Sequence, residues 1–448
     1  MLGLIRCWLP GGWPVRLGGM QWWRSFFDDD VASARRATLL CRLIGLFGLL
    51  LVAATWRLWT PQPGFPQVPL LYAAGSLPPA VQWLVLSGML AGLVGMLLAP
   101  AGRWGRSSLW LFALATLVLM LLNQHRLQPW AYQFVLLAVV LASTRPAMAV
   151  AVARLFLVSF YFHSAMTKCD YAFLHTLGQQ FLAVLLQLMG GSIDDWSSST
   201  RIMLAWLFPI GELLVAAGLS FAPSRRFALA GAVALHVLLL IILGPWGLDH
   251  WPGVLLWNAY FIAQDLVLFA GARRAQAGDV AEVPGSGDRL RPPSFITALM
   301  AAGMVLPFLQ PWAWFDLWPS WGLYAACSER VALQVHRQQR ENLPEELYPF
   351  LTEPAEADDP WLTLRLDRWS LAALGAPIYP QNRMQLGVAQ SVISQSDLGN
   401  RARIVRFSLA DRWSGERRHD ILTGPAQCEA AAGEYWLNAR PRGAPRGE

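Results

Sequence analysis

The sequence has 448 residues, of which 55% are hydrophobic and only 14% are charged. A soluble globular protein of this length has about a quarter of its residues charged, so the composition excludes that class and predicts a polytopic membrane protein. The net charge of +6 comes from arginines in short loops, which membrane orientation explains better than nucleic-acid binding does. We therefore expect the lipid bilayer as a partner and no nucleic acid.

The five cysteines form no CxxC pair and no Cys/His cluster with metal-ligand spacing. This pattern excludes a self-contained dithiol oxidoreductase of the CxxC kind and predicts no metal site. Residues 1–36 lack a cleavable signal pattern and are rich in tryptophan, so we expect a cytoplasmic N-terminal segment at the membrane interface.

Residues 37–310 contain apolar runs that predict a membrane core of about nine transmembrane helices. The expected spans are residues 37–56, 81–99, 108–122, 131–142, 147–165, 202–221, 227–243, 251–270 and 295–309. The span at 131–142 is short for a bilayer, so a tilted or partly re-entrant helix is the alternative to a full crossing. Apolar residues at helical spacing within 171–189 predict an amphipathic helix on the membrane surface.

The distribution of basic residues predicts the orientation of these spans. Arginines at positions 35, 36, 103, 106, 145, 225, 226, 273, 274, 289 and 291 fall in loops on one side. Only Arg57, Arg126, Lys168 and Arg201 are assigned to the other side. By the positive-inside rule, the N-terminus is cytoplasmic, the C-terminus is extracytoplasmic, and the protein resides in the cell (inner) membrane.

Residues 311–448 are soluble in character and predict a small extracytoplasmic α+β domain. Residues 361–366 and 403–409 alternate like strands, and 386–396 has a helical pattern. Cys327 and Cys428 both lie in this domain, where a disulfide and two free buried thiols are open alternatives. The predicted fold class is an all-α polytopic membrane protein with this domain at its C-terminus.

Lys168 is the only lysine in the chain, so the other 34 of the 35 basic residues are arginine. Arginine replaces lysine at most solvated or lipid-flanking positions, but a guanidinium does not give up its proton as an amine does. Lys168 is therefore a candidate general base. The alternative is a membrane-edge charge that has no chemical role.

Three further polar residues are expected to reach the outer membrane face beside Lys168. His125 follows the third span, and His163 and Asp170 flank the end of the fifth. Together with Lys168 they form the predicted catalytic group, placed where an amphiphilic quinol would enter from the lipid. The alternative is an interfacial belt of polar residues whose side chains reach toward the water.

Ionisable residues also occur inside the predicted spans, where they are expensive and usually functional. Glu212 and His236 are predicted to line a cavity or to relay protons, with a buried hydrogen bond that fixes helix packing as the alternative. Arg154 and Asp265 are expected at similar depth in the membrane, which predicts a structural ion pair.

The segment Ser-Ala-Met-Thr-Lys-Cys-Asp-Tyr-Ala-Phe at 164–173 resembles a segment of vitamin K-dependent gamma-glutamyl carboxylases and of their bacterial relatives with a horizontally transferred transmembrane (HTTM) domain. In that family the lysine is the proposed base that deprotonates the quinol, and Lys168 matches it. The segment Asn-Gln-His-Arg-Leu at 123–127 is similar to a family segment that carries an active-site histidine, which would be His125. Glu212 and His236 match the helix pair that follows, and the likeness covers about residues 75–270.

Residues 150–271 also resemble the smaller DoxX/MauE redox-associated membrane unit, in which an arginine opens the first helix and a lysine closes it. These resemblances imply a redox-associated membrane protein with a gamma-carboxylase-like, quinol-linked core. One alternative is a non-catalytic maturation or assembly factor for exported redox proteins, which would have an exported protein as its partner. A proton-coupled transporter that uses Glu212 and His236 is the other alternative.

Overall fold

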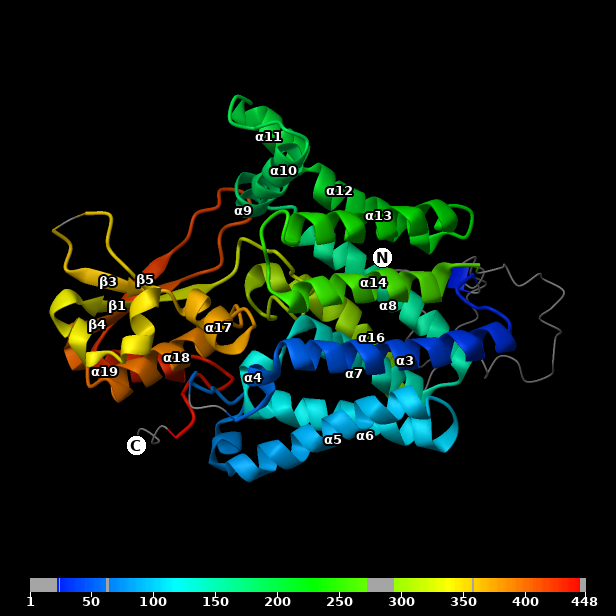
Figure 1. Ribbon diagram of the computed structural model, residues 1–448, viewed down its shortest axis with the longest axis horizontal. Helices are drawn as coiled ribbons and strands as arrows, with labels where there is room; N and C mark the ends of the chain where they lie inside the picture. Colours follow the sequence, from blue (N-terminus) through cyan, green and yellow to red (C-terminus); the bar gives the residue numbers. More distant parts are fainter. Residues whose placement is uncertain (1–21, 24, 62–63, 272–293, 357, 444–448) are drawn as a thin grey trace, which may run out of the picture.

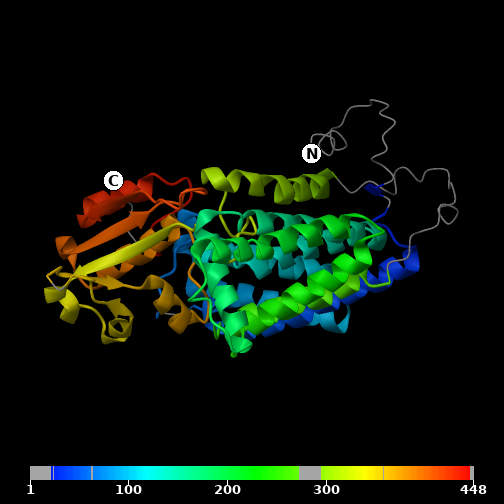
Figure 2. The same ribbon diagram turned by 90° about the horizontal axis from the view of Figure 1, so that it is seen from above.

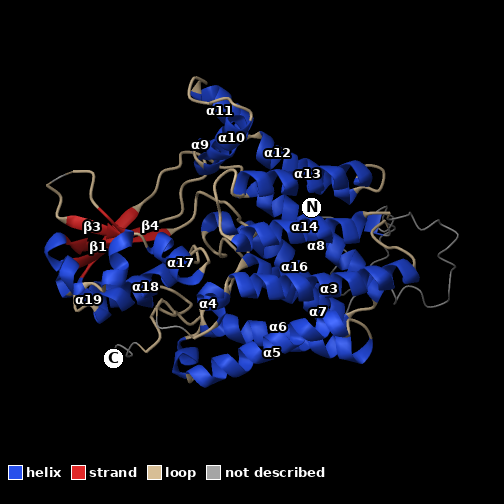
Figure 3. Cartoon of the chain, in the orientation of Figure 1, coloured by secondary structure: helices blue, strands red, loops and turns tan. Residues whose placement is uncertain are grey.

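The computed structural model describes residues 22–23, 25–61, 64–271, 294–356 and 358–443. In this part of the chain, a bundle of long helices carries a smaller domain at one end (Figures 1 and 3). Most of the predicted N-terminal segment 1–36 lies outside the described residues.

Eight helical segments in the described ranges are long and apolar enough to cross a membrane, as expected of a multi-pass membrane protein. Each overlaps one of the predicted spans. They are α3 (Asp30–Ala54), α5 (Pro79–Leu98), α6 (Gly102–Leu122), α8 (Pro146–Met166), α11 with α12 (Ser198–Ala205 and Leu207–Ser220), α13 (Arg225–Leu243), α14 (Pro252–Phe269), and α16 with the 3₁₀ helix η3 (Ser294–Val305 and Leu306–Trp312). The membrane orientation stays a prediction.

The short fourth helix of the bundle, α7 (Pro129–Ser143), is almost completely enclosed. All of its residues except Tyr132 and Ser143 are buried. A helix that is apolar on all sides is stable where other helices surround it, and α7 lies against α3, α6 and α8. Its 15 residues are fewer than the ~20 that a hydrocarbon core requires, which explains why residues 131–142 had the weakest span pattern.

Helix α8 carries the candidate site, and it also lies inside the bundle. It packs against α3, α7, α12, α14 and α16, and α16 runs along the outside of the bundle in Figure 2. The predicted span 202–221 is interrupted between Ala205 and Leu207. Pro209 explains this break, because its ring clashes with the carbonyl four residues earlier and it donates no hydrogen bond there.

The predicted surface helix at 171–189 is divided into α9 (Tyr171–His175) and α10 (Leu177–Leu188), which project from the bundle with α11 in Figure 1.

The C-terminal domain is built on an antiparallel sheet with strand order β2-β3-β1-β4-β5. Its elements are β1 (Arg330–His336), β2 (Leu351–Thr352), β3 (Trp361–Leu364), α17 (Leu366–Leu374), α18 (Asn382–Gln395), β4 (Ala402–Phe407), β5 (His419–Thr423) and α19 (Gly424–Gly433). The predicted strands and helix are confirmed with boundaries shifted by a few residues. Cys327 and Cys428 are both buried free thiols, so no disulfide joins them.

A buried polar junction fastens this domain to the end of the bundle. The guanidinium of Arg383 forms an ion pair with Asp316, and its Nε donates to Gln124 of the bundle at 2.8 Å. Asp316 also accepts a hydrogen bond from the Tyr379 hydroxyl, at 2.5 Å. Arg383 thus joins the domain to the bundle through Gln124, and its pair with Asp316 fixes the guanidinium where water has little access.

Replacing Arg383 tests this junction. Arg383→Leu leaves Asp316 without its cation in a largely buried site, so we expect a loss of about 3 kcal/mol in unfolding free energy and faster proteolysis between residues 311 and 330. Arg337→Leu, in an exposed pair with Glu353, is the matched control and should change stability by about 0.5 kcal/mol or less. Equal stability of the two variants would contradict the proposed role of the junction.

Candidate functional site

One face of α8 carries polar residues at seven-residue intervals. Arg154, Tyr161 and Lys168 are each two helical turns apart, about 10 Å, so they share one side of the helix and its continuation. All three side chains are buried. The centre of the bundle therefore contains a polar stripe that runs along most of α8.

Lys168 forms a buried ion pair with Glu212 of α12. Its Nζ lies 2.9 Å from each carboxylate oxygen of Glu212, and the two residues are only 3% and 5% exposed. The same Nζ donates to the Ser164 hydroxyl at 2.7 Å and to the Ser164 carbonyl at 3.2 Å. The ammonium thus has a partner for each of its donors, which is what a charge removed from water requires.

The C-terminal domain contributes directly to the position of Lys168. Arg412, in the loop between β4 and β5, donates to the carbonyls of Met166 and Cys169, at 2.7 and 3.0 Å. Its own carbonyl accepts from the Tyr171 amide at 2.8 Å. These bonds occupy carbonyls that the end of α8 leaves free, and they hold the backbone on both sides of Lys168.

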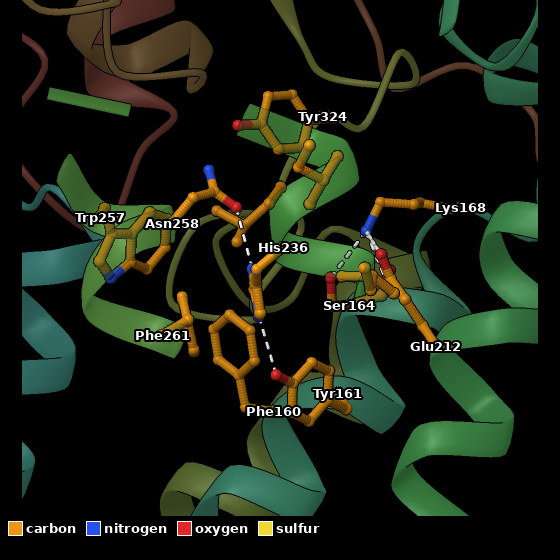
Figure 4. Close-up of a pocket in the computed structure, with 13 residues that line it drawn as sticks. Phe160, Tyr161, Ser164, Lys168, Glu212, His236, Trp257, Asn258, Phe261 and Tyr324 are labelled. Carbon is orange, nitrogen blue, oxygen red and sulfur yellow. Dashed lines mark hydrogen bonds and ion pairs between the residues drawn. The ribbon is translucent and has the colours of Figure 1, made fainter. Parts of the chain in front are cut away.

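A small cavity lies beside the ion pair (Figure 4). The helices α8, α12, α13 and α14 and the residues after α8 supply its polar lining, which includes Lys168, Glu212, Tyr161, His236 and Asn258. The segment after η3 contributes Leu323 and Tyr324. Its volume is about 20 Å³, which is room for about one water molecule.

The segment that covers the cavity has an unusual backbone. Trp321 and Tyr324 have φ angles of 62° and 56°, a region that large side chains rarely adopt. Packing holds Trp321 there, because its ring contacts Phe156, Phe160 and Tyr132 at centroid distances of 5.0 to 5.2 Å.

A second polar group extends from the cavity into the bundle. The Tyr161 hydroxyl lies 2.8 Å from Nε2 of His236 and 2.7 Å from Oδ2 of Asp265. Nδ1 of His236 lies 2.9 Å from Oδ1 of Asn258. Tyr161 therefore joins His236 and the cavity to the buried carboxyl of Asp265.

Of the predicted catalytic group, only Lys168 lines this cavity. His125 lies against the C-terminal domain, where its Nε2 donates to the Pro377 carbonyl at 2.8 Å. His163 bonds the Met304 carbonyl at 2.9 Å, and Asp170 accepts from the Phe173 amide at 2.6 Å as the cap of α9. These three side chains join elements of the fold, so a catalytic cluster around Lys168 does not form from them.

The predicted ion pair between Arg154 and Asp265 is wrong. Arg154 instead contacts Asp28, with 2.6 Å between Nη2 and Oδ2, and it donates to the Phe26 and Leu268 carbonyls. The segment before α3 supplies Asp28 and the Phe26 carbonyl, and α14 supplies the Leu268 carbonyl. A comparison of depths along the sequence does not reveal these contacts. Asp265 bonds Tyr161 instead.

Glu212 and His236 do meet at one cavity, together with Lys168. The sequence analysis missed Tyr161 and Asn258, and it did not pair Lys168 with Glu212. The seven-residue spacing of Arg154, Tyr161 and Lys168 was the available signal for Tyr161. Nothing comparable identified Asn258, because a single amide in an apolar helix has no distinctive pattern.

No protein-family model matches this sequence, and no curated protein or solved structure matches it either.

A double replacement tests whether the Lys168–Glu212 pair is desolvated. Lys168→Met and Glu212→Leu should each lower the unfolding free energy in detergent micelles by about 3–5 kcal/mol, because each leaves one charge buried alone. The double variant removes both charges and should return to within about 1 kcal/mol of the wild type. Single variants as stable as the wild type would show that water still solvates the pair.

The burial of His125 predicts a pH dependence of stability. Burial lowers the pKa of His125 from 6.5 to about 4, so between these values the unfolded chain binds a proton that the folded chain does not. The contribution of His125 to the free energy of unfolding is therefore fully present above pH 6.5. It is lost as the pH falls toward 4, and the loss is about 3 kcal/mol. Between pH 7 and pH 4, His125→Gln should lose about 3 kcal/mol less unfolding free energy than the wild type. An equal loss in both proteins would contradict the burial of a neutral His125.

Proposed function

We propose that this protein is an integral membrane protein that performs acid–base chemistry with the Lys168–Glu212 pair. The observation that carries the proposal is the arrangement of these two groups with His236 around one cavity. Buried ionisable groups in a membrane bundle are expensive, and they mark functional sites more often than they serve packing. The resemblance of residues 164–173 to a base-bearing segment supports the same residue, Lys168.

The pair acts as a single proton acceptor. Its charged form contains the Lys168 ammonium and the Glu212 carboxylate, with 2.9 Å between their atoms. Transfer of a proton from the ammonium to the carboxylate leaves an amine and a carboxylic acid. A weak acid HA that reaches the cavity then transfers its proton to the amine, and the product is A⁻ beside an ammonium and a carboxylic acid. Glu212 then holds the added proton while Lys168 stabilises the anion, so the net charge of the site is unchanged.

A quinol is the substrate class that the sequence resemblance implies. The donor set fits its acidic hydroxyl, because an ammonium, a carboxylate and an imidazole line one cavity. The volume does not fit its ring, since a cavity that holds benzene measures about 150 Å³. The covering segment at 323–324 would have to move before a quinol could meet Lys168, so we assign no reaction step to a bound quinol.

The other two functions predicted from the sequence differ in their support. A proton-coupled transporter requires Glu212 and His236 to share a cavity, and they do. A maturation factor requires a docking surface for an exported protein, and no described feature favours one.

The base is tested by quinolate formation. In lipid nanodiscs without oxygen, reduced 2-methyl-1,4-naphthoquinone is added at a pH at which the free quinol stays protonated, and the absorbance of the quinolate is recorded. We expect about one quinolate per wild-type protein and at least tenfold less with Lys168→Arg, which keeps the charge but does not release a proton near neutral pH.

The single lysine allows a matched control. Arg57 is exposed in α4 (Trp56–Trp59), the short helix that follows α3, so Arg57→Lys should behave as the wild type. Lys168→Arg with Arg57→Lys returns one lysine to the chain and should remain inactive. If Lys168→Arg formed as much quinolate as the wild type, Lys168 would not be the base. If the wild type formed no quinolate, a quinol would not be the substrate.

A further inference from the structure

The hydrogen bonds around Tyr161 permit two arrangements of protons. Nδ2 of Asn258 donates to the Val254 carbonyl, so Oδ1 of Asn258 accepts and Nδ1 of His236 must carry a hydrogen. The Tyr161 hydroxyl has a single hydrogen but two neighbours, Nε2 of His236 and Oδ2 of Asp265. It can donate to only one of them.

If Tyr161 donates to Asp265, Nε2 of His236 must donate to Tyr161, which gives an imidazolium and a carboxylate. If Tyr161 donates to His236, Asp265 must hold a proton and donate to Tyr161, which gives a neutral imidazole and a carboxylic acid. The two arrangements differ by one proton shift along each of two bonds, 2.7 and 2.8 Å long. No heavy atom has to move, which is the geometry of a proton relay.

The cavity lies between these hydrogen-bonded groups and the Lys168–Glu212 ion pair. Tyr161, His236, Lys168 and Glu212 all line it, and it has room for about one water molecule, which could bridge the Tyr161 hydroxyl and the Glu212 carboxylate. Both ring nitrogens of His236 are occupied, by Tyr161 and by Asn258, so His236 exchanges its proton with Tyr161. A proton that leaves Asp265 passes to Tyr161, and the Tyr161 hydroxyl releases its own proton through the water to Glu212. Each step breaks one O–H or N–H bond and forms another, so no co-reactant is required.

The hydrogen-bond chain ends at Asp265, close to the end of the bundle that is opposite Lys168. Asp265 lies four residues before the end of α14 at Phe269, about 6 Å along the helix. Its Oδ1 has no hydrogen-bond partner among the described residues, and the same holds for the Tyr260 hydroxyl and Nε2 of Gln264. All three residues are fully buried. Buried polar atoms of this kind are typical of a site that binds water or exchanges a proton.

We propose that Asp265, Tyr161 and His236 form a proton relay that connects the Lys168–Glu212 pair with the opposite end of the helix bundle. The relay depends on the same ion pair as the proposed function but not on a quinol. It gives the bundle a further activity, which is proton conduction along the inner face of α8.

Proton flux into proteoliposomes tests the relay. Vesicles that contain a pH-sensitive dye receive an acid pulse, with valinomycin and potassium to compensate the charge. Wild-type protein should equilibrate the internal pH faster than protein-free vesicles do. Tyr161→Phe removes a single oxygen, so it should reduce the protein-dependent rate at least tenfold, and Asp265→Asn should do the same.

Tyr132→Phe is the matched control, because Tyr132 is a tyrosine of the neighbouring α7 that stacks on Trp321 and has no place in the relay. It should keep the wild-type rate. A wild-type rate equal to that of protein-free vesicles would overturn the relay, and so would full flux through Tyr161→Phe. Quinolate formation at Lys168 does not require Tyr161, so the flux assay and the quinolate assay can fail independently.

Discussion

The ion pair between Lys168 and Glu212 sets the strongest constraint on this structure. Removing both charges from water costs several kcal/mol for each, and only close contact with full hydrogen bonding offsets that cost. The pair meets both conditions, because Ser164 occupies the donors that Glu212 leaves free. Helices α8 and α12 must therefore stay in one register, since a small shift would leave a charge without its partner.

The surroundings of the pair can be understood from this requirement. Pro209 interrupts the helix before Glu212, so α12 starts afresh at Leu207 and is free to approach α8. The Arg412 loop holds the backbone on both sides of Lys168, and Arg383 anchors the domain that carries this loop. The C-terminal domain thus belongs to the site. It supplies the segment 321–324, which covers the cavity, and Arg412, which holds the backbone around Lys168.

The sequence predicted the features that depend on local composition. Apolar runs located the long helices, alternation located β3 and β4, and the single lysine identified a residue that lines the central cavity. The partners of these residues were harder to predict, because contacts between distant segments leave no local pattern. Similar depth in the membrane predicted an ion pair between Arg154 and Asp265, whereas Arg154 pairs with Asp28. The resemblance at 123–127 predicted an active-site role for His125, whereas His125 binds the Pro377 carbonyl of the C-terminal domain.

The single lysine also makes the charge state of Lys168 directly measurable. Protein grown with ¹³C- and ¹⁵N-labelled lysine gives a single lysine signal in an NMR spectrum, and that signal reports the charge of Lys168. We expect an ammonium signal in the wild type at neutral pH and a neutral amine signal in Glu212→Gln, because a buried ammonium without its carboxylate loses a proton. The same ammonium signal in both proteins would show that Lys168 does not depend on Glu212 for its charge, and the ion pair would then not set the constraint described above.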